Sequence, residues 1–113
     1  MKSMAPADGE TVEVVDGVFL TQLVSGERMS VQHFHIESGA RVPRHSHEHE
    51  QAGHVARGTF TFVLDDEEHV IHPGESFVIP PDVPHAAENR SEMPVDGIDV
   101  FSPPRENPPW GDE

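Results

Sequence analysis

The sequence predicts an all-β fold in a single domain, on three observations. Short apolar stretches alternate with turn residues at intervals of about 8–12 residues, a pattern typical of a β-sandwich or a β-barrel. No stretch shows the period of an amphipathic helix. Eleven prolines and nine glycines interrupt the chain of 113 residues often, which favours many short strands over helices. A chain of this length suits one domain with a modest core.

Nine strands are expected, each bounded by glycine, proline or aspartate residues suited to tight turns. The alternation is clearest in residues 60–64, where Phe60, Phe62 and Leu64 would share one face of a strand. The predicted strands are Thr11–Val15, Val18–Val24, Met29–Ile36, Gln51–Ala56, Thr59–Leu64, His69–Ile71, Ser76–Ile79, His85–Asn89 and Val95–Phe101.

The two ends of the chain differ in composition from the centre. Residues 1–10 have weak structural signals and are expected to form a flexible N-terminal segment. Residues 11–102 form the predicted domain. Residues 103–113 contain four prolines, which exclude a central strand and predict a proline-rich C-terminal extension.

Charge and composition exclude several classes of function. Acidic residues number 21 and basic residues 7, so the net charge is −14 with histidine neutral, which argues against nucleic acid or an anionic membrane as a partner. The absence of cysteine excludes disulfides, thiolate metal sites and cysteine nucleophiles. No apolar run is long enough to span a membrane, and the N-terminus lacks a signal-peptide pattern, so a cytoplasmic location is predicted.

Nine histidines in so short a chain are the unusual feature, and two of them stand two positions apart at His45 and His47. In extended backbone such residues point to one face, with Cα atoms about 6.5–7 Å apart. Both imidazoles can then place a nitrogen about 2.0–2.2 Å from one ion. The chain is expected to reverse around residues 48–50, so that Gln51 returns on the neighbouring strand with its side-chain oxygen as a further ligand.

A third histidine, His85, follows a stiff segment that contains Pro80, Pro81 and Pro84. A lone His-x-His pair is more often an ordinary surface feature, but the proline-framed third histidine favours a metal site. Imidazole ligands suit zinc, nickel, iron, copper or cobalt, and the sequence does not distinguish among these metals. The remaining histidines are not expected to bind the ion: His33, His35, His49, His54, His69 and His72.

The last predicted strand places an acid and an aromatic residue on one face. Asp99 and Phe101 alternate with Ile98 and Val100, so if this face lines the interior of a barrel, two prolines would then let Arg105 reach back across its mouth. A carboxylate in an apolar barrel is a candidate general base, and arginine suits a two-pronged contact with a substrate carboxylate. The alternative is an ion pair between Asp99 and Arg105 that only closes the barrel.

Gly53 lies two positions after Gln51 and so shares its face of the strand. Its missing side chain would leave room for a substrate. The alternative interpretation is a glycine at a β-bulge.

Two glycine-bounded segments resemble the two sequence motifs of the cupin family. The first motif is matched by Gly39, His45, His47, Gln51 and Gly58. The second is matched by Gly74, Pro80, Asp82, His85 and Asn89. The resemblance implies a cupin-type double-stranded β-helix, or jelly-roll barrel, that holds one divalent transition metal ion per chain through His45, His47, Gln51 and His85.

Two positions depart from the usual cupin pattern. Asp82 replaces a glycine, which aspartate tolerates because it adopts turn conformations readily. Gln51 replaces a glutamate, so three neutral imidazoles and a neutral amide would leave the charge of the ion uncompensated. Such an ion is a stronger Lewis acid and would attract anionic substrates.

The chain further resembles small single-domain cupins of the KdgF type, which are pectin-degradation proteins. They share the His-x-His-x-x-x-Gln site and an Asp-x-Phe-Ser-Pro-x-Arg ending, which here begins at Asp99 and ends at Arg105. The resemblance implies activity on small anionic sugar acids, namely conversion of unsaturated uronates into linear keto acids, with Asp99, Phe101 and Arg105 as the active residues. It also implies a homodimer. An iron- or nickel-dependent dioxygenase and a non-catalytic binding or sensor domain are the alternatives.

Overall fold

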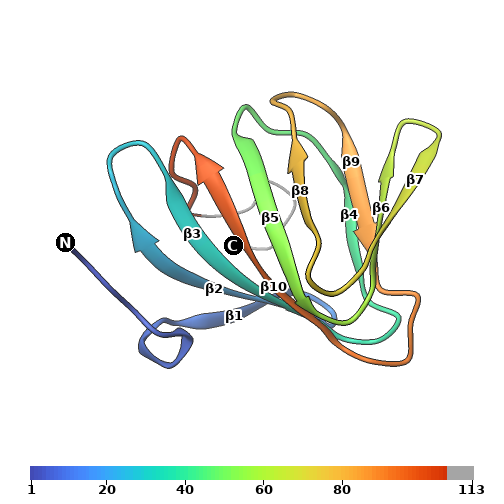
Figure 1. Ribbon diagram of the computed structural model, residues 1–113, viewed down its shortest axis with the longest axis horizontal. Helices are drawn as coiled ribbons and strands as arrows, with labels where there is room; N and C mark the ends of the chain where they lie inside the picture. Colours follow the sequence, from blue (N-terminus) through green and yellow to red (C-terminus); the bar gives the residue numbers. More distant parts are fainter. Residues whose placement is uncertain (107–113) are drawn as a thin grey trace.

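Two antiparallel β-sheets that face one another make up the protein. The computed structural model describes residues 1–106, and within them it contains ten strands. In spatial order, the larger sheet contains β1 (Thr11–Val15), β2 (Val18–Ser25), β3 (Ser30–Ile36), β10 (Val95–Ser102), β5 (Glu50–Arg57) and β8 (Ser76–Ile79). The smaller sheet contains β4 (Arg41–His45), β9 (His85–Glu88), β6 (Phe60–Leu64) and β7 (Glu67–Ile71). In Figure 1 the larger sheet occupies the left and centre and the smaller sheet the right.

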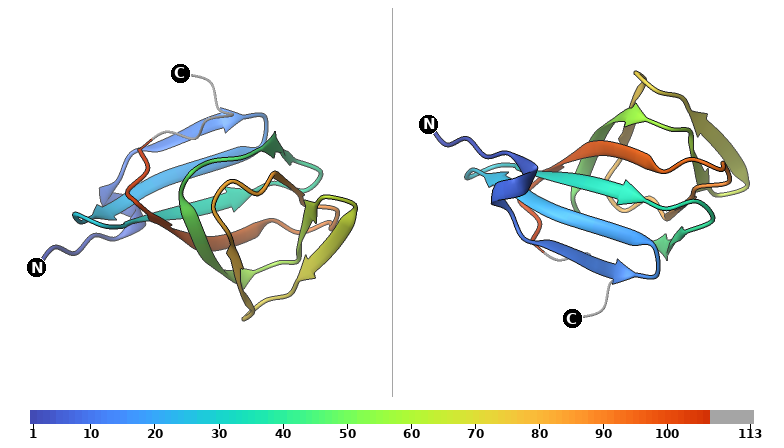
Figure 2. Two further views of the ribbon diagram at one scale, coloured as in Figure 1. Left: turned by 90° about the horizontal axis from the view of Figure 1, so that it is seen from above. Right: turned by 90° about the horizontal axis from the view of Figure 1, so that it is seen from below.

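The all-β prediction is therefore confirmed. Among the described residues the helical content is a single 3-10 turn at Pro6–Asp8. Both views in Figure 2 show the strands curving around a common interior, as expected for a jelly-roll barrel. No helix within residues 1–106 is long and apolar enough to cross a membrane.

One strand was not predicted. β4 consists of Arg41, Val42, Pro43, Arg44 and His45, and this polar sequence with a proline lacks the apolar alternation of a strand. It forms nonetheless because it is the edge strand of the smaller sheet and pairs only with β9. An edge strand tolerates proline, since its outer side needs no hydrogen-bond donor. β7 also begins earlier than predicted, at Glu67 rather than at His69.

The barrel interior is apolar at one end and polar at the other. Val95 of β10 lies opposite Ile36 of β3, and both are buried in the hydrophobic core. Toward the other end of the same strand pair, Asp99 lies opposite Gln32, and both of these polar residues are also buried. The strand register therefore gathers buried polar groups at the end of β10 that leads to the C-terminus.

The apolar end is stabilised by aromatic packing between the two sheets. Phe34 of β3 stacks on Phe60 of β6 with ring centroids 5.8 Å apart, and Phe62 contacts Phe77 of β8 at 4.6 Å. Burial of one such side chain contributes about 1.5–3 kcal/mol to folding. This core holds the two sheets at a fixed spacing, on which the geometry of the polar end depends.

The chain continues past β10 and folds back onto the barrel. The backbone N–H of Arg105 donates to Oγ of Ser30 over 2.9 Å, which ties this segment to β3. Arg105 itself is buried. Residues 107–113 of the predicted C-terminal extension lie outside the described residues, and the division into residues 1–10, 11–102 and 103–113 stays a prediction.

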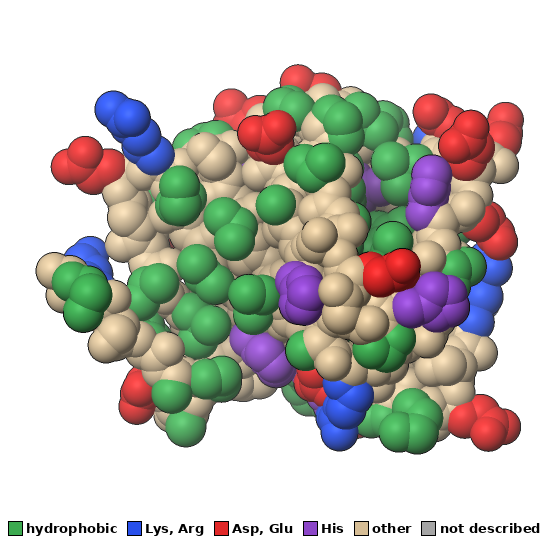
Figure 3. Space-filling model, viewed as in Figure 1, with side chains coloured by type: hydrophobic (Ala, Val, Ile, Leu, Met, Phe, Trp, Pro, Cys, Tyr) green, Lys and Arg blue, Asp and Glu red, His purple; other side chains and the backbone are tan. Residues whose placement is uncertain are grey.

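Acidic side chains lie mainly along the edges of the face seen in Figure 3. Hydrophobic and uncharged side chains occupy much of its centre. The strongly negative charge of the chain is thus carried at its surface, where water solvates it.

Candidate metal centre

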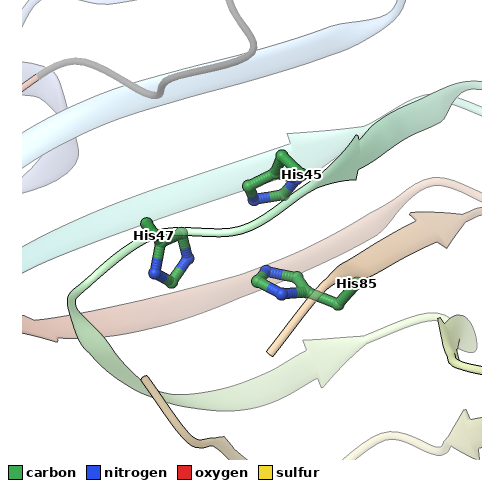
Figure 4. Close-up of side chains that lie close together, drawn as sticks. All are labelled: His45, His47 and His85. Atoms are coloured by element: carbon green, nitrogen blue, oxygen red, sulfur yellow. The ribbon is translucent and has the colours of Figure 1, made fainter. Parts of the chain in front are cut away.

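Three histidines converge at the polar end of the barrel. His45 is the last residue of β4, His47 lies in the connection that follows, and His85 is the first residue of β9. His45 and His85 lie opposite one another in the β4–β9 pair. Their rings turn toward one another (Figure 4), and one potential ligand nitrogen from each lies within 4.8 Å of those of the other two. This cluster could hold a metal ion.

Backbone carbonyl groups orient all three rings. Nδ1 of His45 lies 2.8 Å from the oxygen of Pro43, and Nδ1 of His85 lies 2.8 Å from that of Val83. Nδ1 of His47 lies 3.0 Å from the oxygen of His49. Such contacts hold the proton on Nδ1 and make Nε2 the nitrogen that ligates a metal.

Gln51 completes the arrangement from the opposite sheet. Its Oε1 lies 3.1 Å from Nε2 of His47. Neutral imidazole carries one proton, so it cannot donate both to this oxygen and to the carbonyl oxygen of His49. One of the two contacts of His47 therefore places two acceptors face to face. A cation beside Nε2 and Oε1 removes this repulsion, so the residues present fit a metal ion.

Burial keeps the three imidazoles in the neutral form that binds metals. Desolvation lowers the pKa of His45 to about 3, and the hydrogen bond to Pro43 offsets only part of this effect. Desolvation also lowers the pKa of His47 and of His85, to which the nearby charge of Arg105 adds. Proton competition for these ligands is consequently weak at neutral pH.

A buried carboxylate adjoins the cluster. Asp99 of β10 accepts a hydrogen bond from Nε2 of Gln51 at its Oδ1, over 3.1 Å, and one from Nε2 of Gln32 at its Oδ2, over 3.2 Å. Desolvation raises the pKa of Asp99 to about 6, and these hydrogen bonds and the charge of Arg105 limit the rise. The carboxyl group thus exchanges a proton more readily near neutral pH than an exposed aspartate does.

Arg105 lies beside this carboxylate without pairing with it. The two residues, both within the described chain, form no ion pair, and Gln32 lies between them: its Oε1 accepts a hydrogen bond from Nη2 of Arg105 over 3.4 Å. A direct ion pair that closes the barrel was the alternative interpretation of the sequence, and it is wrong.

The ring of Phe101 packs against the guanidinium group of Arg105. The guanidinium carbon of Arg105 lies 3.7 Å from the centre of the Phe101 ring, a cation–π contact. Desolvation lowers the pKa of Arg105 to about 10, so the group stays charged at neutral pH. Its Nε is buried and has no hydrogen-bond partner within residues 1–106.

The polar groups share one cavity in the barrel. Gln32, Gln51, Asp99 and Arg105 line it together with histidines 45 and 85, and apolar residues complete its wall. Phe101 does not belong to this lining.

Gly53 leaves no room for a substrate, contrary to expectation. A Cβ atom at this position would lie 2.2 Å from Cζ of Phe77 and 2.8 Å from Oδ1 of Asp99. The space beside Gly53 is therefore already filled. A bulge is also absent here, since Gly53 pairs regularly with Asp99 and Phe77.

The path of the chain between the histidines also differs from expectation. β4 and β5 belong to different sheets, so the segment after His45 crosses the barrel rather than forming a hairpin. Gln51 approaches the histidines from the facing sheet, not from a neighbouring strand.

Gln32 is the site residue that the sequence analysis missed. It is 1% exposed and lies on the inward face of β3, in line with Phe34 and Ile36. The available signal was a polar residue on the apolar face of an alternating strand.

The six other histidines lie outside the three-histidine cluster. His35 is half-buried, and its Nδ1 lies 2.6 Å from Oδ1 of Asp96. His49 is also half-buried and supports His47 through its backbone oxygen.

Comparison with known proteins agrees with this architecture. The family model described as "Cupin domain" matches residues 32–101, so the chain belongs to the cupin family. Among curated proteins, the pectin degradation protein KdgF of Dickeya dadantii (strain 3937) is 28% identical over 94 residues, which cover 82% of this chain and 84% of that protein.

Two solved structures are similar over nearly the whole chain. KdgF from Halomonas sp. has a TM-score of 0.84 and 27% identity, covering 94% of this chain and 96% of that one. An RmlC-like cupin from Shewanella frigidimarina has a TM-score of 0.83 and 27% identity, covering 94% of both chains. The protein is thus a small cupin with a relationship to KdgF.

Proposed function

We propose that this cupin is a metal-dependent enzyme that isomerises small sugar acids, converting 4,5-unsaturated uronates into linear 5-keto acids. One observation carries the proposal: a single cavity is lined by His45 and His85 of the histidine cluster, by the buried carboxyl group of Asp99 and by the charged Arg105. The similarity to KdgF, named as a pectin degradation protein, supports this choice of substrate class.

His45, His47, Gln51 and His85 would hold one divalent transition metal ion. All four ligands are neutral, so a bound ion would supply strong Lewis acidity toward substrate oxygens. The ion would also attract an anion into a protein whose net charge is −14.

Arg105 would bind the carboxylate of the uronate. Its guanidinium group is charged, buried and in contact with the Phe101 ring, and its Nε has no partner within the described protein. A planar guanidinium group with available donors suits a two-pronged contact with a carboxylate. Phe101 would act by holding this plane in place.

Asp99 would move the proton. The proposed conversion is an isomerisation and needs no added reactant. The anomeric hydroxyl loses a proton, its oxygen becomes a carbonyl, and the bond between C1 and the ring oxygen breaks. The enol thus released at C5 becomes a ketone when C4 receives a proton. A carboxyl group whose pKa is about 6 can both accept and return a proton.

A spectrophotometric assay tests the proposal. Purified protein loaded with zinc, nickel or iron is mixed with unsaturated uronate monosaccharides, and the loss of the absorbance of the conjugated double bond is followed against the spontaneous rate. We expect acceleration that disappears after chelation. If no metal-loaded form accelerates any uronate, the proposal is wrong, and iron-loaded protein should then be tested for dioxygen consumption. A homodimer and a cytoplasmic location remain predictions, and light scattering checks the first.

A further inference from the structure

Four polar side chains of the site are connected in series by hydrogen bonds and form one hydrogen-bonded chain of side chains. It runs from Gln51 on β5 through Asp99 on β10 and Gln32 on β3 to Arg105. Asp99 lies opposite Gln32 in the β3–β10 pair, so the strand register itself brings the two together. Every member is buried.

The chain has a direction that Asp99 imposes. An ionised carboxylate only accepts hydrogen bonds, so both neighbouring amides must turn their NH2 groups toward it. The carbonyl oxygens then point away from Asp99 on either side. Oε1 of Gln51 faces His47 and Oε1 of Gln32 faces Arg105. A reversed Gln51 would present N–H groups to the histidine cluster, where they would repel a cation.

Gln32 holds the carboxylate in the orientation that this arrangement requires. Its NH2 group occupies Oδ2 of Asp99, which leaves Oδ1 for Gln51. Its oxygen accepts hydrogen bonds from Arg105 and from Nε2 of Gln22, over 3.4 and 3.2 Å. Because Gln32 is bonded on both sides and is 1% exposed, its own amide cannot turn without leaving buried groups unpaired.

We propose that Gln32 is a positioning residue of this site, which acts through Asp99 to aim the oxygen of Gln51 at the three histidines and holds Arg105 beside them. The inference rests on the metal site proposed above. It does not depend on the identity of the substrate, since its first consequence is for metal binding.

Cobalt titration tests the inference directly. Metal-free protein at about pH 8, where Asp99 is ionised, is titrated with Co²⁺, whose visible absorption reports the number and kind of its ligands. Gln32→Met keeps the length of the side chain and removes its three hydrogen bonds, with Asp99, Arg105 and Gln22. Asp99→Asn keeps the volume of the side chain but replaces one acceptor oxygen with an NH2 group. Only one of Gln51 and Gln32 can then keep its NH2 group directed at residue 99. Loss of such an orienting residue typically lowers metal affinity about 10–100-fold.

We expect about a 10-fold or greater loss of Co²⁺ affinity in Asp99→Asn and about a 3–10-fold loss in Gln32→Met, each with an altered cobalt spectrum. Thr21→Val is the matched control. Thr21 is a buried polar residue on β2, the strand next to β3. Its hydroxyl group bonds to Thr11, which takes no part in the hydrogen bonds from Gln51 to Arg105. This variant should keep the wild-type affinity and spectrum.

Two outcomes would contradict the inference in different ways. If the wild-type protein binds no Co²⁺, the metal site itself is wrong, and this inference is overturned with it. If the wild-type protein binds Co²⁺ and both variants match its affinity and spectrum while folded, only the positioning role is wrong. Should Gln32→Met fail to fold, Asp99→Asn decides alone.

Discussion

The backbone N–H of Asp82 donates to the backbone oxygen of His47 over 2.8 Å, which joins the two histidine-bearing segments directly. Asp82 has a φ of 63°, in the left-handed region that most side chains avoid. This hydrogen bond therefore holds the proline-containing turn before His85 next to the connection that contains His47. The relative placement of these two histidines depends on this backbone contact.

Substitution of Asp82 tests that dependence. Asp82→Val should destabilise the protein by about 1–2 kcal/mol, because a β-branched residue is strained at positive φ. Asp82→Gly is the matched control and should keep wild-type stability and metal content. Equal melting temperatures for the two variants would show that the turn conformation does not matter.

Removal of one histidine should remove the metal. His47→Ala is expected to abolish metal binding, because the three remaining ligands hold an ion weakly. His54→Ala is the control, since His54 lies on the exposed face of β5. Elemental analysis after dialysis measures both, and full metal content in His47→Ala would reject the proposed ligand set.

Acid should weaken the metal-free protein as well as release the metal. The three clustered histidines have folded-state pKa values below 6.5, so the unfolded chain binds more protons as the pH falls from 6.5 toward 3. Their contribution to stability is therefore present above pH 6.5 and is lost below it. Asp99 acts in the opposite direction between pH 6 and 3.8, because its pKa is raised, but it is one group against three.

Thermal melts of chelated protein at about pH 7.5 and 5.5 measure this effect. The melting temperature should fall with pH, and it should fall less in His85→Gln, which lacks one of the titrating groups. A melting temperature that rises on acidification would contradict the assignment of buried neutral imidazoles. In the metal-loaded protein, metal release near pH 5 should accompany the change.

Asp99→Asn should lose most of its turnover even when metal saturates the variant. An amide cannot accept the proton, and a positioned general base contributes about 10²–10⁴-fold to the rate. Asp96→Asn is the control, because Asp96 lies on the same strand outside the cavity and pairs with Arg57. Undiminished kcat in metal-saturated Asp99→Asn would end the catalytic role of this residue.

Arg105→Lys should raise the KM for uronates more than it lowers kcat. Lysine cannot reproduce a two-pronged contact, and the loss of one charge-assisted hydrogen bond, worth about 1.5–3 kcal/mol, predicts a KM increase of about 10–100-fold. Arg57→Lys, on the exposed surface, controls for a change of cation alone. An unchanged KM in Arg105→Lys would place the substrate carboxylate elsewhere.

The sequence alone was sufficient for the fold class and for the three histidines. Alternation along strands and turn residues between them are local properties, so nine of the ten strands within residues 1–106 could be predicted. The spacing of His45, His47 and His85 within two motifs is likewise readable along the chain. The exception, β4, lacks an apolar face, because an edge strand with a proline depends on its partner β9 rather than on its own pattern.

The tertiary structure decided what surrounds the histidines. Gln32 and Asp99 are 67 positions apart, and only the pairing of β3 with β10 brings them into contact. The ring of Phe77, from a third strand, fills the space that Gly53 leaves open. The sequence determined which residues are available to bind a metal and which carboxyl group is available to exchange a proton. Closure of the barrel decided which of them touch, because contacts between distant strands depend on register and sheet spacing, and neither leaves a local pattern in the chain.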